Sequence, residues 1–298
     1  MNYVLYILIC FCIYAVLAIS MNLVVGGCGL LSLAHASFFA IGAYTYAILS
    51  INFQMDLVLS AVIVLVVVAF FSLILSLQSW RLKGDFFVLG SLAVQALVYN
   101  SIRNWFSEAP PGTLSNLTNG SHGLSINFKP VAIGIQLGTY GRLFVIAVVL
   151  FCVAFFIFSS LDSSAWGRTI VAMRDDELSA RGLGKDTRLL KVQAIMFSSV
   201  FASFAGVLYA CLISYVDPLR GALDESILFL SMVLIGGAGN MKGPIIGALT
   251  LLLLREILGL TPISETLVAD LRTLAYGLLL IIIVRFRPQG IAGNYKLE

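Results

Sequence analysis

The chain has 298 residues, of which 60% are hydrophobic and only 11% are charged, and its formal net charge is +3. A mean hydropathy of +1.00 leaves too little polar surface to cover a soluble globule, and the small net charge does not suggest a nucleic-acid partner. The composition therefore predicts an all-α integral membrane protein.

Apolar runs along the chain approach the roughly 20 residues that a helix needs to cross a bilayer. They predict a polytopic bundle of about nine (8–10) transmembrane helices in a single domain, residues 1–298. The predicted crossings are 3–20, 34–50, 57–77, 86–101, 142–160, 193–215, 225–240, 243–259 and 270–285. Between them we expect an external loop at about 102–141 and a cytoplasmic loop at about 161–192.

Basic residues give the predicted orientation, because Lys and Arg are retained preferentially on the cytoplasmic side. If the loop 161–192 is cytoplasmic, twelve of the 18 Lys and Arg lie inside and six lie outside. The C-terminal tail is then inside as well. Nine crossings put the N-terminus outside.

Two glycine-rich stretches interrupt the apolar pattern, one in each half of the chain. The first contains Gly26, Gly29, Ser32, His35 and Gly42, and the second contains Gly236, Gly237 and Gly239. Broken hydrophobic segments in both halves are typical of a translocation pathway, because broken helices expose backbone groups at a cavity. Close helix packing explains any single glycine equally well. His35 could donate a hydrogen bond to a solute, but a satisfied buried histidine that orders the helix break is favoured.

Residues 166–191 concentrate six of the 18 basic and four of the 15 acidic residues. The GLGKDT motif is not a phosphate loop, because Lys185 is followed by Asp186 and position 179 is Ser rather than Gly. The pair Asp175 and Asp176 lacks the further carboxylate one turn later that a metal site would need. The near balance of charge does not indicate nucleic-acid binding.

The same stretch predicts a short amphipathic helix that lies parallel to the membrane. Asp175 could cap its start, with Asp176 and Glu177 in the first turn, where the helix dipole favours negative charge. Arg181 lies in the last turn, and Gly184 can end the helix. A solvated connector is an equally weighted alternative, although a long ordered loop tends to carry function.

Three separated motifs resemble the branched-chain amino-acid permease family of bacterial ATP-binding-cassette (ABC) importers, and also the related urea and amide permeases. They are LVVGGCGLLSLAHASFFAIGAY (23–44), A-x-R-D-D-E-x-x-A-R-x-x-G (172–184) and LIGGAGNMKGPIIGA (234–248), followed by the tail RPQGIAG (287–293). In the external loop the chain departs from the family pattern T-G-G-x-x-G-L, because residues 118–124 read TNGSHGL.

The resemblance implies a multi-pass permease of the bacterial inner membrane that forms half of a pore, paired with a homologous permease subunit. The other implied partners are two ATPase subunits, an external substrate-binding protein and membrane lipid. The charged loop would be a coupling helix that docks on an ATPase, with Arg174, Asp175, Asp176, Glu177, Ala180, Arg181 and Gly184 as its coupling residues. No cofactor, metal or catalytic residue is expected in this chain, since ATP and Mg would be bound by the partner subunits.

Two other classes of function compete with an ATP-driven permease. An ion-coupled carrier normally needs ionisable residues at membrane depth, and charges within the predicted crossings are few. Among them, Arg255, Glu256, Asp270 and Arg272 are expected near the outer surface. An intramembrane enzyme would need paired deep carboxylates, a metal cluster or a nucleophile with a histidine, and the sequence shows none of these patterns. The transport subunit is therefore the favoured function, with branched-chain or neutral amino acids as substrate and urea or short amides as the alternative.

Overall fold

The computed structural model describes residues 2–82, 84–113, 115–126, 131–132, 135–136, 140–259, 265–287 and 289–292. The helices are α1 (Asn2–Asn22), α2 (His35–Phe53), α3 (Leu57–Gln78), α4 (Asp85–Asn104), α5 (Tyr140–Ser163), α6 (Ala165–Asp175), α7 (Glu177–Gly182), α8 (Thr187–Ile213), α9 (Leu223–Gly236), α10 (Lys242–Gly259) and α11 (Glu265–Phe286). Short helical turns are η1 (Leu23–Gly27, π-helical), η2 (Gly120–His122) and η3 (Pro218–Gly221). The strands are β1 (Leu124–Ser125), β2 (Val131–Ala132), β3 (Ile135–Gln136) and β4 (Tyr215–Val216).

Each of the nine predicted crossings coincides with a helix, but the count of nine crossings is not confirmed. Among the described residues, six helices are long and apolar enough to span a membrane: α1 with η1, α2, α3, α4, α5 and α8. Helix α9 has only 14 residues, which is too short to cross alone. Helix α10 carries three charged residues, Lys242, Arg255 and Glu256.

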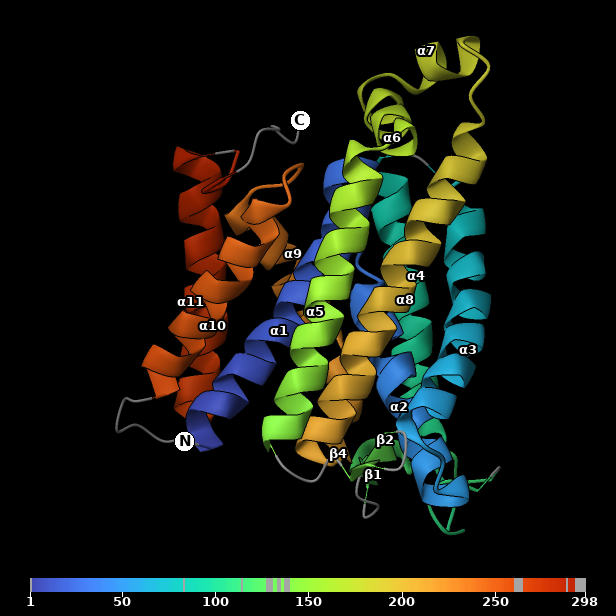
Figure 1. Ribbon diagram of the computed structural model, residues 1–298, viewed down its shortest axis with the longest axis vertical. Coiled ribbons are helices and arrows are strands. Elements are labelled where there is room, and N and C mark those ends of the chain that lie inside the picture. Colours follow the sequence, from blue (N-terminus) through green and yellow to red (C-terminus); the bar gives the residue numbers. More distant parts are fainter. Residues whose placement is uncertain are drawn as a thin grey trace.

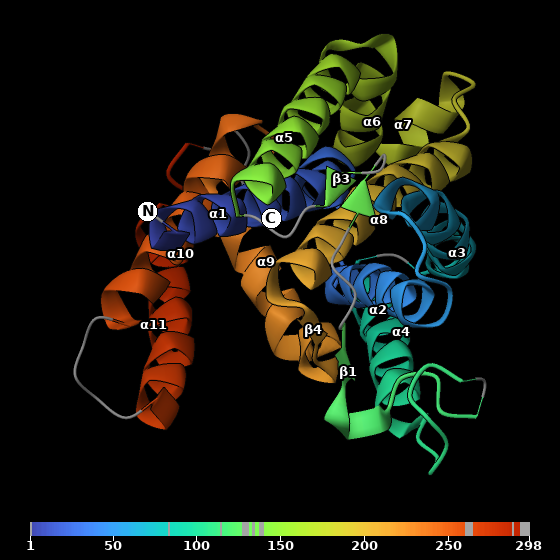
Figure 2. The same cartoon turned by 60° about the horizontal axis from the view of Figure 1, so that its bottom comes forward.

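The long helices pack side by side, and the two ends of the bundle differ in what they carry (Figure 1). Helices α6 and α7 lie at one end, together with the C-terminal end of α11. Strands β1, β2 and β4 lie at the opposite end, where α1 begins. Figure 2 shows α11 at one edge of the bundle and α3 at the other. The predicted external and cytoplasmic loops therefore lie at opposite ends.

Both halves of the chain contain a segment that turns back inside the bundle. After η1 the chain reverses through residues 28–34, and α2 then begins at His35. In the second half, η3 lies beside the middle of α4, because Gln95 donates a hydrogen bond from Nε2 to the carbonyl oxygen of Gly221 at 2.7 Å. The backbone N–H of Ala36 donates to Oγ of Ser226 at 3.3 Å. The N-terminal ends of α2 and α9 therefore meet within the bundle.

Helices α2 and α8 approach each other closely through glycine. A Cβ atom at Gly42 would overlap the backbone carbonyl of Ser203, and one at Gly206 would overlap the carbonyl of Phe39. Small residues permit this close approach of the two backbones. It matters in a membrane, because lipid supplies no hydrophobic drive between helices and their association depends on van der Waals packing.

The loop after α4 is fastened to the end of α8. Strand β1 pairs antiparallel with β4, so that Leu124 faces Val216 in the register and Ser125 faces Tyr215. The hydroxyl of Tyr215 also donates to the carbonyl oxygen of His122 at 2.8 Å. Residues 114, 127–130, 133–134 and 137–139 of the predicted external loop lie outside the described residues.

The opposed ends give a labelling prediction. In a background with the exposed native Cys152 replaced by Ser, we expect Ser121→Cys to react with a membrane-impermeant thiol reagent in intact cells, whereas Lys185→Cys reacts only after permeabilisation. Both positions are exposed, so access to the reagent rather than burial decides the result. Labelling of Lys185→Cys alone in intact cells would show that the orientation is inverted.

Candidate functional site

The charged loop folds as two helices rather than one, and its capping residue differs from the predicted one. The backbone of Asp176 is extended (φ −152°, ψ 102°), and its Oδ1 accepts hydrogen bonds from the N–H groups of Leu178 and Ser179 at 2.9 and 3.0 Å. Asp175 is still the last residue of α6. The prediction of Asp175 as the cap was therefore wrong, because an N-cap needs a non-helical backbone and only Asp176 has one.

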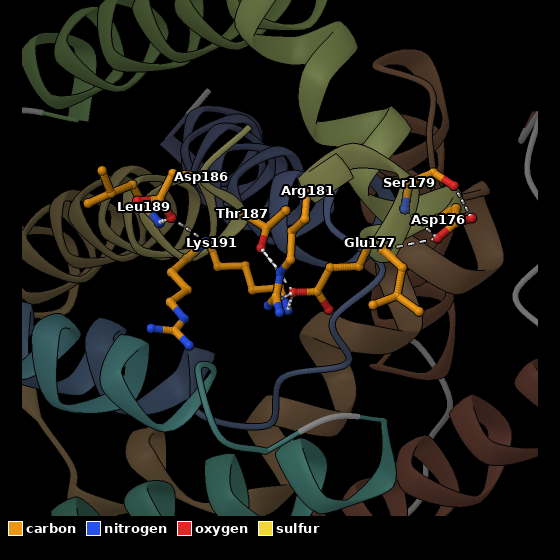
Figure 3. A network of polar contacts seen from close by, with 10 residues as sticks. Asp176, Glu177, Ser179, Arg181, Asp186, Thr187, Leu189 and Lys191 are labelled. Carbon is orange, nitrogen blue, oxygen red and sulfur yellow. Dashed lines mark hydrogen bonds and ion pairs between the residues drawn. The ribbon is translucent and has the colours of Figure 1, made fainter. Parts of the chain in front are cut away.

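Glu177 joins α7 to the start of α8 (Figure 3). Its Oε1 accepts from Arg181 Nη2 at 2.6 Å, from Lys191 Nζ at 3.0 Å and from Thr187 Oγ1 at 3.1 Å. The side chain of Lys191 is only 7% exposed, which favours a retained ion pair over hydration. Partial burial alone would raise the pKa of Glu177, but the hydrogen bonds and charge of Lys191, with Thr187 and Arg181, lower it below its usual value. Glu177 is therefore charged at neutral pH.

The surface that α7 leaves open is partly apolar. Leu178 is 73% exposed and Leu183 is 81% exposed, whereas Ala180 is buried. Gly184 follows with φ +77°, and its open surroundings would accept a Cβ without a clash, so backbone conformation rather than space requires glycine there. Sequence analysis overlooked the two leucines, although two apolar residues within a charged stretch are a readable signal of a contact surface.

Arg174 reaches inward from the end of α6 to the first glycine-rich stretch. Its Nη1 donates to the carbonyl oxygen of Gly26 at 2.7 Å, and its Nη2 pairs with Asp175 at 3.0 Å. The aliphatic part of Arg174 lies over Gly29, which has φ +68° and where a Cβ would stand 2.8 Å from Arg174 Cγ. The arginine side chain is only 10% exposed. The charged loop and the glycine stretch are thus in direct contact.

The two glycine-rich stretches also contact each other. A Cβ at Gly26 would overlap the backbone nitrogen of Gly239 and Oδ1 of Asn22. That Oδ1 accepts a hydrogen bond from the Gly239 N–H at 3.1 Å, and Asn22 Nδ2 donates to the carbonyl oxygen of Asn240 at 3.3 Å. We call this the glycine contact: Asn22 and Gly26 on one side, Gly239 and Asn240 on the other. Sequence analysis missed Asn22, a single amide that ends an apolar run just before the glycines.

The other predicted pathway residues have different surroundings. Gly42 packs α2 against α8, and a Cβ at Gly236 would overlap the carbonyl of Gly243 in α10. Ser32 accepts a hydrogen bond from the N–H of Ala34 at 3.3 Å. His35 is 3% exposed, and its Nε2 lies 2.9 Å from Oγ of Ser20 in α1. These four positions take part in helix packing and internal hydrogen bonds, and their role in the substrate pathway stays a prediction.

The C-terminal tail secures the end of α9 next to the glycine contact. Gly237 has φ +107° and ends the helix. The backbone N–H groups of Ile291 and Ala292 donate to the carbonyl oxygens of Ile235 and Gly236 at 2.9 and 2.8 Å. Asn240 Nδ2 donates to the carbonyl oxygen of Ala292 at 3.0 Å, so the tail holds the turn that carries Gly239.

Charged side chains also occur within the bundle, and sequence analysis did not single out two of them, Arg220 and Glu225. Arg220 in η3 pairs with Glu225 in the first turn of α9, beside the middle of α4. Arg255 reaches Tyr14 of α1, and Glu256 accepts from the hydroxyl of Tyr3 at 2.5 Å, near the start of α1. The side chains of Asp270 and Arg272 lie outside the described ones. Within the described part of the chain, no group of three His, Cys, Asp or Glu residues could hold a metal ion.

Residues 3–284 match the family described as the branched-chain amino acid transport system/permease component. The chain belongs to this family. It is 28% identical to the high-affinity branched-chain amino acid transport system permease protein LivM of Escherichia coli, over 94% of this chain and 67% of the relative. It is 25% identical to the corresponding permease protein BraD of Pseudomonas aeruginosa, over 96% of this chain and 93% of the relative. No solved structure matches the chain significantly.

Membership in the permease family confirms the resemblance that was inferred from the sequence motifs. The chain is a polytopic membrane protein of predominantly helical structure and a permease component of a transport system. A shorter similarity of 31% identity, over 33% of this permease, links it to the autoinducer 2 import system permease protein LsrC of Yersinia pestis. The relatives that this chain resembles therefore carry different transported solutes in their names.

Proposed function

We propose that this permease forms half of the translocation pathway of an ABC importer in the bacterial inner membrane, for branched-chain or other neutral amino acids. Its partners would be a homologous permease, two ATPase subunits that bind ATP and Mg, and an external substrate-binding protein. Names of relatives that cover nearly the whole chain support the substrate class.

The observation that carries the proposal is the hydrogen bond from Arg174 to Gly26. An ATPase docked on the exposed leucines of α7 would move α6 and α7, and Arg174 would pass that displacement to the glycine contact. Glu177 would pass the same displacement to α8, because its hydrogen bonds to Thr187 and Lys191 join α7 to the start of that helix. Gly26 of the glycine contact bonds Arg174 of α6, and α6 lies at the end of the bundle that carries α7 (Figure 1). We therefore expect the glycine contact to close the pathway on the ATPase side.

An ion-coupled secondary carrier is the alternative function from a different class of transport protein. The ion pair of Arg220 and Glu225 begins in η3, which lies beside the middle of the predicted crossing α4. A scarcity of deep charges therefore argues less strongly against a carrier than the sequence suggested. Urea or a short amide is the alternative substrate. Uptake measurements with and without ATP distinguish both alternatives from the proposed function.

We expect this permease to hydrolyse no ATP on its own and to take up leucine only as part of a complex with ATPase subunits. The reason is the absence of a phosphate loop from the sequence, since Lys185 is followed by Asp186. The measurement is leucine uptake into proteoliposomes that contain the purified complex and its binding protein, with and without ATP inside. ATP-independent uptake driven by an ion gradient would support the carrier instead. ATP-dependent uptake of urea but not of leucine would show that urea is the substrate.

A further inference from the structure

A cavity of about 200 Å³ lies between α1, η3, α9, α10 and α11, apart from the glycine contact. Its polar lining includes the charged residues Arg220, Glu225 and Arg255, together with Tyr14, Thr273 and Tyr276. Tyr14 is buried, and the side chains of Arg220 and Glu225 are 31% and 17% exposed. Two guanidinium groups and a single carboxylate thus line a small cavity between α1 and the C-terminal helices. Its lining carries a net positive charge.

The two arginines have different partners. Arg220 Nη1 pairs with Oε1 of Glu225 at 2.5 Å, and its guanidinium also lies 5.2 Å from the ring centroid of Tyr209. Arg255 Nη1 donates one hydrogen bond, to the hydroxyl of Tyr14 at 3.1 Å. Within the described part of the chain, no carboxylate lies at ion-pair distance from Arg255. A guanidinium has five N–H donors in a planar fork that fits a carboxylate. The unused donors of Arg255 therefore suit an anionic ligand group.

Glu225 retains the capacity to bind a cationic group. Only its Oε1 bonds Arg220, and its Oε2 makes no hydrogen bond to the described residues. A carboxylate can accept about four hydrogen bonds. The ammonium of a small ligand could therefore share Glu225 with Arg220, while the ligand's carboxylate binds Arg255.

The remaining lining suits an aliphatic side chain. Leu228 and Met232 come from α9, and Leu251 and Leu252 come from α10. Binding sites for small molecules typically combine such an apolar lining with a few polar groups that fix orientation. Met232 lies one helical turn from Gly236 in α9, so one side of the cavity lies close to the glycine-rich turn. A solute bound here would be next to the segment that we expect to move.

We propose that this cavity binds a zwitterionic amino acid with an aliphatic side chain, with its carboxylate on Arg255 and its ammonium on Glu225. This proposal rests on the proposed function and gives it a recognition site within the membrane. It assigns selection of the substrate in part to the permease itself, through both charged ends of the ligand.

The test measures binding of radiolabelled leucine to the detergent-purified complex of this permease with its ATPases, without the external binding protein. Arg255→Gln is expected to weaken leucine binding about 10- to 100-fold, the range for loss of hydrogen bonds to a charged group. Arg255→Lys keeps the charge but loses the fork, so we expect an intermediate loss. Arg103→Gln removes an exposed arginine at the end of α4 that does not line the cavity, and it should bind leucine as the unsubstituted complex does.

Competition with leucine analogues separates the two charged contacts. Against the unsubstituted complex, both 4-methylpentanoate, which lacks the ammonium, and 3-methylbutylamine, which lacks the carboxylate, should compete more weakly than leucine. With Arg255→Gln, the advantage of leucine over the amine should disappear, which a merely misfolded variant would not show. Size-exclusion chromatography confirms that the variant complexes are intact.

Two results would overturn the proposal. If Arg255→Gln and Arg255→Lys both bind leucine normally while the unsubstituted complex takes up leucine, the cavity is not the recognition site and the proposed function stands. If Arg255→Gln releases co-purified phosphatidylglycerol but keeps leucine affinity, the cavity is a lipid headgroup site. Failure of the unsubstituted complex to transport any amino acid in the presence of ATP would instead reject the proposed function.

Discussion

The substitution Gly26→Ala is expected to lower solute uptake by about 5- to 150-fold while the permease remains in the membrane. The added Cβ would overlap the backbone nitrogen of Gly239, which cannot move away as a side-chain end could. It would also overlap Oδ1 of Asn22, which accepts a hydrogen bond from the Gly239 N–H. Overpacking of this kind costs about 1–3 kcal/mol. The cost falls on the state in which the glycine contact is closed, so the pathway would fail to seal there.

The neighbouring glycine supplies the control for this prediction. A Cβ at Gly27 would stand 3.5 Å from Cγ2 of Ile170 and 3.7 Å from Cδ1 of Leu23, which are ordinary contact distances. Gly27→Ala should therefore transport almost normally. The measurement is leucine uptake normalised to the amount of permease in the membrane by immunoblot. Equal uptake by the two variants would mean that the glycine contact is not part of the pathway.

Glu177→Lys is expected to abolish uptake and to release the ATPase subunits from the purified complex. The substitution removes the acceptor shared by Arg181, Thr187 and Lys191 and adds a third cation to the cluster (Figure 3). Hydrogen bonds to charged groups contribute about 1.5–3 kcal/mol each, and the repulsion between cations adds to the loss. Helix α7 would separate from the start of α8, and the surface formed by Leu178 and Leu183 would lose its fixed position.

An exchange of charges distinguishes anchoring of α7 from a direct role of Glu177 in docking. In the double variant Glu177→Lys with Lys191→Glu, the ion pair between α7 and α8 can form again with its polarity reversed. Recovery of ATPase retention in the double variant would show that Glu177 acts by holding α7. Normal uptake by the single variant would contradict the coupling role of residues 166–191 and would favour a solvated connector.

Features that depend on neighbouring residues could be predicted well from the sequence. The boundaries of α3 and α10 differ from the predicted spans by one residue at most, because an apolar run bounded by polar or glycine residues carries its own signal. The cap of α7 was misplaced by a single position. Asp175 and Asp176 have the same capping chemistry, and only the extended backbone of Asp176 distinguishes them.

The sequence by itself determined that this chain is a helical membrane permease, because apolar runs of bilayer length and the family motifs are local patterns. The tertiary structure alone decided which of those patterns meet. Asn22 and Gly239 are 217 residues apart, and Arg174 and Gly26 are 148 residues apart. From the sequence, Arg174 could have faced either an ATPase or the glycine stretch. Nothing in the sequence indicates that Arg220, Glu225 and Arg255 line the same cavity. These contacts are set by the packing of helices that are far apart in the sequence. Which helix faces approach so closely that only glycine fits between them is decided by the tertiary structure.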